Sequence, residues 1–233
     1  MNEQSARLIE EYINSVGVDD PDKIVSYAYK VIRTFGNGSA ALNATMYDIM
    51  AELSGVNVPP AELADLPDYG EVAKTVYGTM KTSNNSSEIA SAGARLVKRT
   101  GADTMLKNAK RDNAQFAWIP AGDTCAFCLA IASNGWQYVS KESLKNGHAE
   151  HIHSNCDCTY AVRFNDDTTV AGYHPEKYKA MYDSAEGSNS EEKINSMRRR
   201  FYAENRESIL EQKASAYEKR KELNSSSAEE LKV

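Results

Sequence analysis

Apolar residues recur at helical spacing through most of the first 110 residues of the chain. The first group forms one stripe at intervals of three and four, which predicts a helix that ends at Gly17. Asp20 and Pro21 predict the start of a second helix, because Asp is a favoured N-cap and Pro fits the first helical position. The first stripe consists of Leu8, Ile9, Tyr12, Ile13 and Val16.

The Gly-Asn-Gly run at 36–38 predicts a break in the second helix, because glycine is a poor helix former. Ser39 can cap a third helix with an apolar stripe of its own, and we expect it to pack with the others. Residues 55–67 form a predicted loop, and two further helices follow at about 72–80 and 86–106. The stripe of the third helix consists of Leu42, Met46, Ile49 and Leu53.

The pattern changes from helical to mixed after residue 111. Residues 115–120 are aromatic and extended, and a capped short helix over 123–132 follows them. Strand-like alternation occurs at 136–139 and again at 151–164. This order predicts a small α+β module, made of a short helix plus a β-hairpin, within a mostly helical chain.

The last segment of the chain is dense in charge and again helical in pattern. Ten basic and ten acidic residues follow residue 184, so the whole net charge of −6 lies in residues 1–184. Ser188 and Glu191 have the capping-box spacing that predicts a helix start. The apolar stripe behind them is narrow, which is typical of a helix that docks along a seam. It consists of Ile194, Met197, Phe201, Leu210, Ala214 and Tyr217.

Composition narrows the class of protein. Of 233 residues, 41% are hydrophobic and 26% are charged, which indicates a folded chain rather than a disordered one. The acidic net charge argues against a protein that coats nucleic acid by bulk electrostatics. We expect no membrane span and no signal peptide, because no segment has the necessary apolar run. We therefore expect the protein to be made in the cytoplasm.

The chemical signal of the sequence is a cluster of cysteine and histidine. All four cysteines and three of the four histidines lie between residues 125 and 158. Cys125 and Cys128 are three apart at a predicted helix start, so both sulfurs lie on one face. Cys156 and Cys158 share one face of a predicted strand. The two pairs can converge on one tetrahedral ion, and zinc fits best because thiolate and imidazole are its preferred ligands.

The motif offers five donors for four positions. Four protein ligands leave no place for water or substrate, which indicates a structural Zn²⁺ and not a catalytic one. We favour Cys125, Cys128, His153 and Cys158. The strand could equally present Cys156 with Cys158, in which case His153 donates a hydrogen bond to a ligand.

The chain therefore divides into three parts. We predict a helical N-terminal domain at 1–110, a small α+β zinc-binding module at 111–184 and a charged helical tail at 185–233. The fold class is mostly α.

Other interpretations of the cysteines remain open. Two disulfides would need an oxidising compartment, and the sequence shows no secretion signal that would take the chain there. A redox Cys-x2-Cys pair would leave the second cysteine pair and the histidines unexplained, and four unrelated thiols would leave their clustering unexplained.

Enzymatic and nucleic-acid-binding alternatives are weaker. His148 and Glu150 are similar to the His-x-Glu element of zinc deaminases, but they follow the cysteines where a deaminase has them first. A metal-dependent nuclease could use His151 or His153 as base, and it lacks an evident carboxylate pair apart from Asp166 and its neighbour Asp167. A DNA-binding zinc module would need a basic stripe, and only three basic residues lie between 122 and 164.

The motif resembles the phage minor capsid and head morphogenesis proteins of the Mu F-like group. That group has a Cys-x2-Cys, an Ala-Ser-x-Gly turn followed by an aromatic residue, and a His-x2-Cys-x-Cys. Here these are residues 125–128, 132–136 and 153–158, and the Gly-Tyr-His-Pro-Glu-Lys-Tyr segment at 172–178 is also similar. The resemblance covers about residues 112–184.

The resemblance implies a structural virion protein. It implies a minor head component that is made in the host bacterial cytoplasm, built into the capsid and associated with the portal, and that has no enzymatic activity. Its partners would be capsid, portal or scaffold proteins, with no membrane and at most weak contact with nucleic acid. Relatives carry Arg where this chain has Asn134 and Asp157, which argues against a phosphate contact at those two positions.

Overall fold

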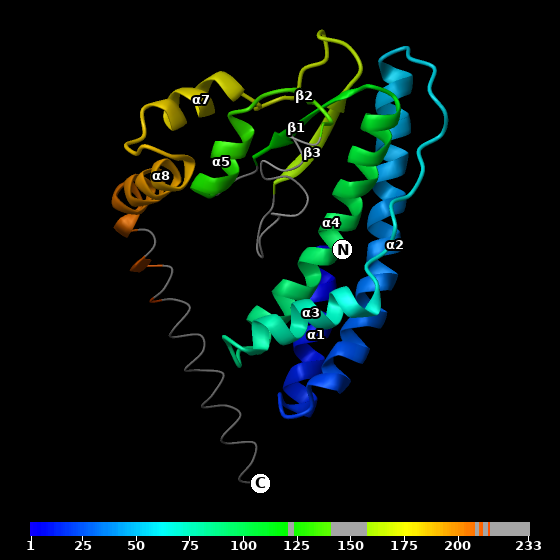
Figure 1. Cartoon of the computed structure of the whole chain (residues 1–233), viewed down its shortest axis with the longest axis vertical. Coiled ribbons are helices and arrows are strands. Elements are labelled where there is room, and N and C mark those ends of the chain that lie inside the picture. The colour runs from blue at the N-terminus through cyan, green and yellow to red at the C-terminus, as the bar shows by residue number, and fades with distance from the viewer. Residues whose placement is uncertain (121–123, 141–157, 208–209, 212–213, 215–233) are drawn as a thin grey trace.

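The computed structural model describes residues 1–120, 124–140, 158–207, 210–211 and 214, and these contain seven helices and one small sheet (Figure 1). Four helices make up the N-terminal half, and three further helices lie together to one side of the sheet (Figure 1). The elements are α1 (Asn2–Val16), α2 (Pro21–Leu53), α3 (Tyr69–Met80), α4 (Ser86–Arg111), β1 (Gln115–Ile119), α5 (Ala126–Ala132), β2 (Gln137–Tyr138), β3 (Thr159–Arg163), α7 (Pro175–Asp183) and α8 (Ser190–Glu204). The mostly helical prediction is confirmed.

The predicted end of the first helix and the predicted start of the second are confirmed. Gly17 follows α1 with a φ of 77°, a backbone conformation that glycine adopts at little cost. The Asp20 side chain accepts a 3.2 Å hydrogen bond from the backbone N–H of Lys23, and Pro21 is the first residue of α2.

The predicted break at 36–38 is wrong, because α2 continues without interruption for 33 residues. The glycines serve packing and not a turn. A Cβ atom built on Gly36 would lie 3.4 Å from Leu66 and 3.5 Å from the hydroxyl of Thr100 in α4. Opposite it, a Cβ on Gly101 would lie 2.5 Å from the hydroxyl of Ser39, so the two helices are in close contact there.

This close contact also overturns the predicted packing of the third stripe. From residue 36 onward, small residues and one tyrosine line the buried face of α2, and the larger apolar residues lie on the opposite face in solvent. Their exposed fractions are between 48% and 83%. The buried residues are Gly36, Ala40, Ala44, Tyr47 and Ala51. The exposed ones are Leu42, Met46, Ile49 and Leu53.

The sheet has the antiparallel strand order β2-β1-β3, with β1 at its centre. The β1–β3 ladder pairs Gln115 with Arg163 at one end and Ile119 with Thr159 at the other. The predicted β-hairpin is therefore wrong, since β2 and β3 each pair with β1 and not with one another. The buried Phe-Ala-Trp run of β1 explains this, because a strand covered on both faces has no polar alternation.

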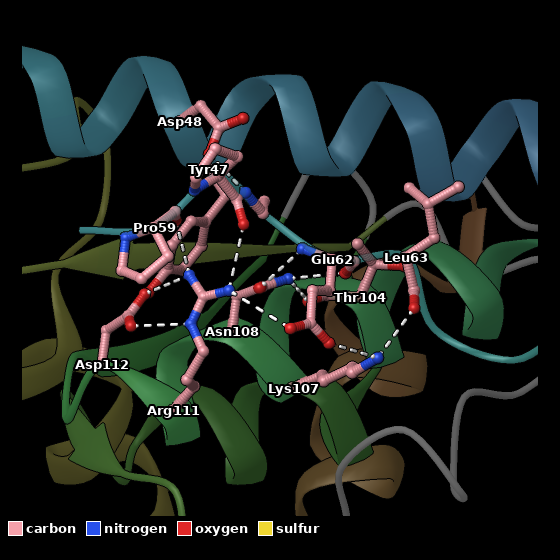
Figure 2. A network of polar contacts seen from close by, with 12 residues as sticks. Tyr47, Asp48, Pro59, Glu62, Leu63, Thr104, Lys107, Asn108, Arg111 and Asp112 are labelled. Carbon is pink, nitrogen blue, oxygen red and sulfur yellow. Dashed lines mark hydrogen bonds and ion pairs between the residues drawn. The ribbon is translucent and has the colours of Figure 1, made fainter.

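A polar network fastens the loop between α2 and α3 to α4 (Figure 2). The side chain of Asn108, which is 1% exposed, accepts a hydrogen bond from the N–H of Glu62 and donates one to its carbonyl. Arg111 donates to the carbonyls of Pro59 and Pro60. The loop therefore has its backbone groups satisfied by side chains, as a segment without regular structure requires.

Helix α8 docks on the module through the first half of the predicted stripe, whereas Leu210 is 47% exposed and Tyr217 lies outside the described residues. Met197 of α8 is 2% exposed and packs in one cluster with Ala126 and Leu129 of α5. The capping box of α8 begins one residue later than predicted. Asn189 is the N-cap, and the Glu192 side chain accepts a hydrogen bond from the N–H of Ser188. No helix in the described ranges is long and apolar enough to cross a membrane.

Candidate functional site

The described cysteines lie where the start of α5 meets the start of β3. Cys125 is the N-cap residue of α5, and Cys128 lies one turn further in the same helix. Cys158 immediately precedes β3. Cys128 and Cys158 are 1% and 2% exposed, and Cys125 is partly buried against the same core cluster.

The residue before the N-cap of α5 lies close to the cysteine before β3. The hydroxyl of Thr124 lies 3.8 Å from the sulfur of Cys158. Thr124 is bonded directly to Cys125, so the first thiol of the Cys-x2-Cys pair and the thiol before β3 belong to one neighbourhood. The three described thiols are not grouped to hold a metal ion, so the convergence of the helix pair with Cys158 stays a prediction.

The remaining predicted ligands cannot be placed. His153 and Cys156 lie outside the described residues, as does His151. Within the described residues, no group of three or more His, Cys, Asp and Glu side chains is arranged to hold a metal ion. The five-donor zinc site therefore stays a prediction that depends on His153 or Cys156.

Buried aromatic residues share the core cluster of the cysteines. The spacing of the cysteines did not predict them. The rings of Trp118 and Tyr160 meet edge to face with centroids 4.7 Å apart, and Phe116 packs beside them. The indole N–H of Trp118 is buried without a hydrogen-bond partner among the described residues. Trp118 pairs with Tyr160, two residues after Cys158, so a hydrogen-bond donor lies on the cysteine side of the sheet.

A second group of side chains joins the turn after α5 to the segment before α7. Gly135 has a φ of 68°, and the following Trp136 packs edge to face on Tyr173 at 5.8 Å. The Tyr173 hydroxyl donates a hydrogen bond to the carbonyl of Ala132, and burial raises the pKa of this hydroxyl above its usual range. Arg163 at the end of β3 stacks its guanidinium over the Trp136 ring at 4.9 Å.

These contacts unite two motifs that are far apart in the sequence. The Ala-Ser-Asn-Gly-Trp turn at 132–136 and the Gly-Tyr-His-Pro segment at 172–175 pack against each other in one core. Gly135 is part of this contact, because a Cβ built there would lie 3.7 Å from Pro175. The motifs that suggested a family resemblance thus build one structural element.

The carboxylates considered for a nuclease do not approach the cysteines as a metal-binding pair. Asp166 forms an ion pair with Arg163 at 2.7 Å, and its side chain is 87% exposed. His174, the fourth histidine, lies at the start of α7 beside Glu176 and is 62% exposed. Neither Asp166 nor Asp167 belongs to a metal-binding group within the described part of the chain.

A comparison with protein families identifies the group to which the chain is related. The model of the VG15 protein family matches residues 1–185. The chain belongs to the VG15 protein family. VG15 is a viral family, and the match runs through α1 to α7 and ends where the charged tail begins. Neither the curated proteins nor the solved structures contain a significant match.

Proposed function

We propose that this VG15 protein is a minor capsid protein of a tailed bacteriophage or prophage that acts in head morphogenesis. It is a structural component of the virion, made in the host cytoplasm, and not an enzyme. Its partners are capsid, portal or scaffold proteins. The observation that carries the proposal is the packing of Trp136 on Tyr173, because it unites the two motifs that resemble the Mu F-like minor capsid branch.

A structural zinc ion completes the proposal. Cys125, Cys128 and Cys158 would supply three thiolates, and His153 or Cys156 the fourth donor. Support comes from the type of donor, since the three described thiols belong to one core cluster and zinc prefers soft sulfur ligands, although the described residues alone form no metal-binding group. The ion would add a cross-link between α5 and β3 to the core that these two short elements share.

The metal is tested by elemental analysis of protein purified without chelators. We expect about one zinc per chain, as a four-ligand site implies. Cys125→Ser and Cys158→Ser should each lose the metal. His174→Ala should keep it, because that histidine is exposed on α7 and outside the motif. Metal-free wild-type protein would refute the zinc site and leave the capsid proposal standing.

The virion role is tested in a phage that carries this gene. Wild-type protein should be found in purified heads by mass spectrometry, and a deletion should give defective heads. Cys125→Ser should leave α1 to α4 folded and reduce incorporation, because the ion would organise the module and not the helical half.

A third measurement distinguishes the nuclease alternative from the structural role. The purified protein is incubated with phage DNA and divalent metals, and we expect no cutting. Metal-dependent cutting that His153→Ala abolishes would establish the nuclease and refute the purely structural role.

A further inference from the structure

The exposed face of α2 carries an apolar seam that the described fold leaves in solvent. We define the seam as Leu42, Met46, Ile49 and Leu53, which are 54%, 51%, 48% and 83% exposed. None of the four belongs to a core cluster of the described residues. The helix lies along one edge of the molecule, with α1, α3 and α4 on its inner side (Figure 1).

The seam has the spacing of a helix-pairing interface. Its intervals are four, three and four residues, so that Leu42 and Ile49 are one heptad apart, as are Met46 and Leu53. It extends over about 17 Å of helix at 1.5 Å per residue. A single exposed apolar residue is ordinary, but four apolar residues in heptad register on one helix face indicate a surface that a partner covers.

We propose that the seam binds the same seam of a second copy of this chain, with the two α2 helices antiparallel about a two-fold axis. A two-fold interface requires a patch that is complementary to itself. The interval order is unchanged by reversal, so Leu42 lies opposite Leu53 of the partner subunit. In the same register Met46 lies opposite Ile49 of the partner subunit, and every seam residue meets an apolar one.

The charges on α2 favour the antiparallel arrangement. Between residues 34 and 54 the only charged side chains are Asp48 and Glu52. The antiparallel register places Glu52 opposite the partner's Asn43, while Asp48 is directed to the loop after α2, where it accepts a 2.8 Å hydrogen bond from the N–H of Ala61. A parallel pair would instead place Glu52 against the partner's Glu52, and like charges in that position are unfavourable.

The size of the seam sets the expected strength. Three turns of helix from each chain give a contact at or below the lower end of specific interfaces, about 1,200 Å² in total. We therefore expect a dimer that forms and dissociates with protein concentration in the micromolar range. This inference is independent of the proposed capsid function and of the zinc site.

The test is sedimentation equilibrium of the full-length protein over a micromolar concentration series. Wild type should shift from monomer to dimer as concentration rises. Met46→Glu and Ile49→Lys should each weaken association by about tenfold or more, because each buries a charge in the seam. Val16→Lys, at an apolar position on α1 that is 42% exposed, should leave association unchanged.

A double variant tests the register. In Met46→Glu/Ile49→Lys each introduced carboxylate faces an introduced ammonium of the partner subunit, so dimerisation should recover. Leu42→Lys/Met46→Glu carries the same two charges on one face, and neither faces its opposite in the antiparallel register, so it should stay monomeric. Circular dichroism of each variant checks that the helices are folded.

Three results would overturn the proposal. They are a monomer at every concentration, a dimer that the seam variants do not weaken, and a dimer that appears only after removal of residues 215–233. The last result would show that the tail of the same chain covers the seam. Recovery in Leu42→Lys/Met46→Glu but not in Met46→Glu/Ile49→Lys would refute the antiparallel register.

Discussion

The hydroxyl of Tyr47 in α2 donates a 2.8 Å hydrogen bond to the carboxylate of Asp112, which directly follows α4. The tyrosine is fully buried, and the Asp112 side chain is only 5% exposed. Arg111 binds the same carboxylate at 2.8 Å, and the Tyr47 ring meets Phe164 after β3 edge to face. One carboxylate therefore links α2 and α4 at the point where the sheet begins.

Tyr47→Phe should destabilise the protein by about 2 kcal/mol, because the buried carboxylate loses a donor. The free energy of unfolding from urea denaturation measures the loss. Tyr202→Phe is the matched control, since that tyrosine is 45% exposed on α8 and should change stability little. Equal effects of the two variants would show that the Tyr47 hydroxyl contributes nothing.

The same carboxylate should make stability depend on acid. The Arg111 guanidinium lowers the pKa of Asp112 below its ordinary 3.8, and the hydrogen bond from Tyr47 lowers it further against the effect of burial. A lowered carboxyl pKa contributes stability that is complete above the unfolded value of about 3.9 and is lost as pH falls through the folded value. The difference in unfolding free energy between wild type and Asp112→Asn should thus be largest above about pH 5 and shrink below about pH 4. A difference that does not change with pH would refute the coupling.

Gly101→Ala should destabilise the contact between α2 and α4, although alanine is the better helix former by about 1 kcal/mol. The new methyl group would lie 2.5 Å from the Ser39 hydroxyl and collide with Asn43, and overpacking of this kind costs about 1–3 kcal/mol. Gly78→Ala in α3 is the control, because nothing lies within 4 Å of its Cβ position. Thermal unfolding should show a lower midpoint for the first variant and a higher one for the second.

Met197→Asp should release α8 from α5, because it places a carboxylate at a position that is 2% exposed in an apolar cluster. Trypsin should then cut rapidly at the exposed arginines 198–200, which a docked helix protects through its backbone conformation. Tyr202→Asp lies on the exposed side of the same helix and should digest like wild type. Mass spectrometry of the early fragments reads the result, and equal cutting in all three proteins would show that the seam does not hold α8.

Local signals in the sequence predicted the ends of several helices. Asp20 with Pro21, and Gly17 with its positive φ, act within one turn of the chain, so they could be identified without the fold. The apolar stripe that docks α8 was also visible, because Ile194, Met197 and Phe201 repeat at helical spacing.

Features that depend on distant segments could not be predicted. The role of Gly36 depends on Leu66 and Thr100, and nothing near residue 36 distinguishes a tight helix contact from a break. The exposure of Leu42 and Met46 follows from the small residues on the other face of α2, which reverses the usual rule that the larger side chains are buried. Strand partners likewise depend on long-range pairing, which is why 115–119 was missed as the central strand.

The zinc site stays a prediction, and the sequence carried no signal of the residues that surround the cysteines. The spacing of Cys125, Cys128 and Cys158 pointed to one location, and the buried start of α5 lies beside that of β3. The aromatic wall of Trp118 and Tyr160 carries no metal-binding signature, so only the packed structure shows it.

The unbroken course of α2 has a mechanical consequence. At 1.5 Å per residue its 33 residues form a rod about 50 Å long that touches α1 near one end and β3 near the other. Gly36 and Gly38 would let an isolated helix bend, but Leu66 and Thr100 flank the first and Met1 lies against the second. A load applied where α2 meets β3 is therefore carried along the helix axis to α1, and within α2 neither glycine is free to act as a joint.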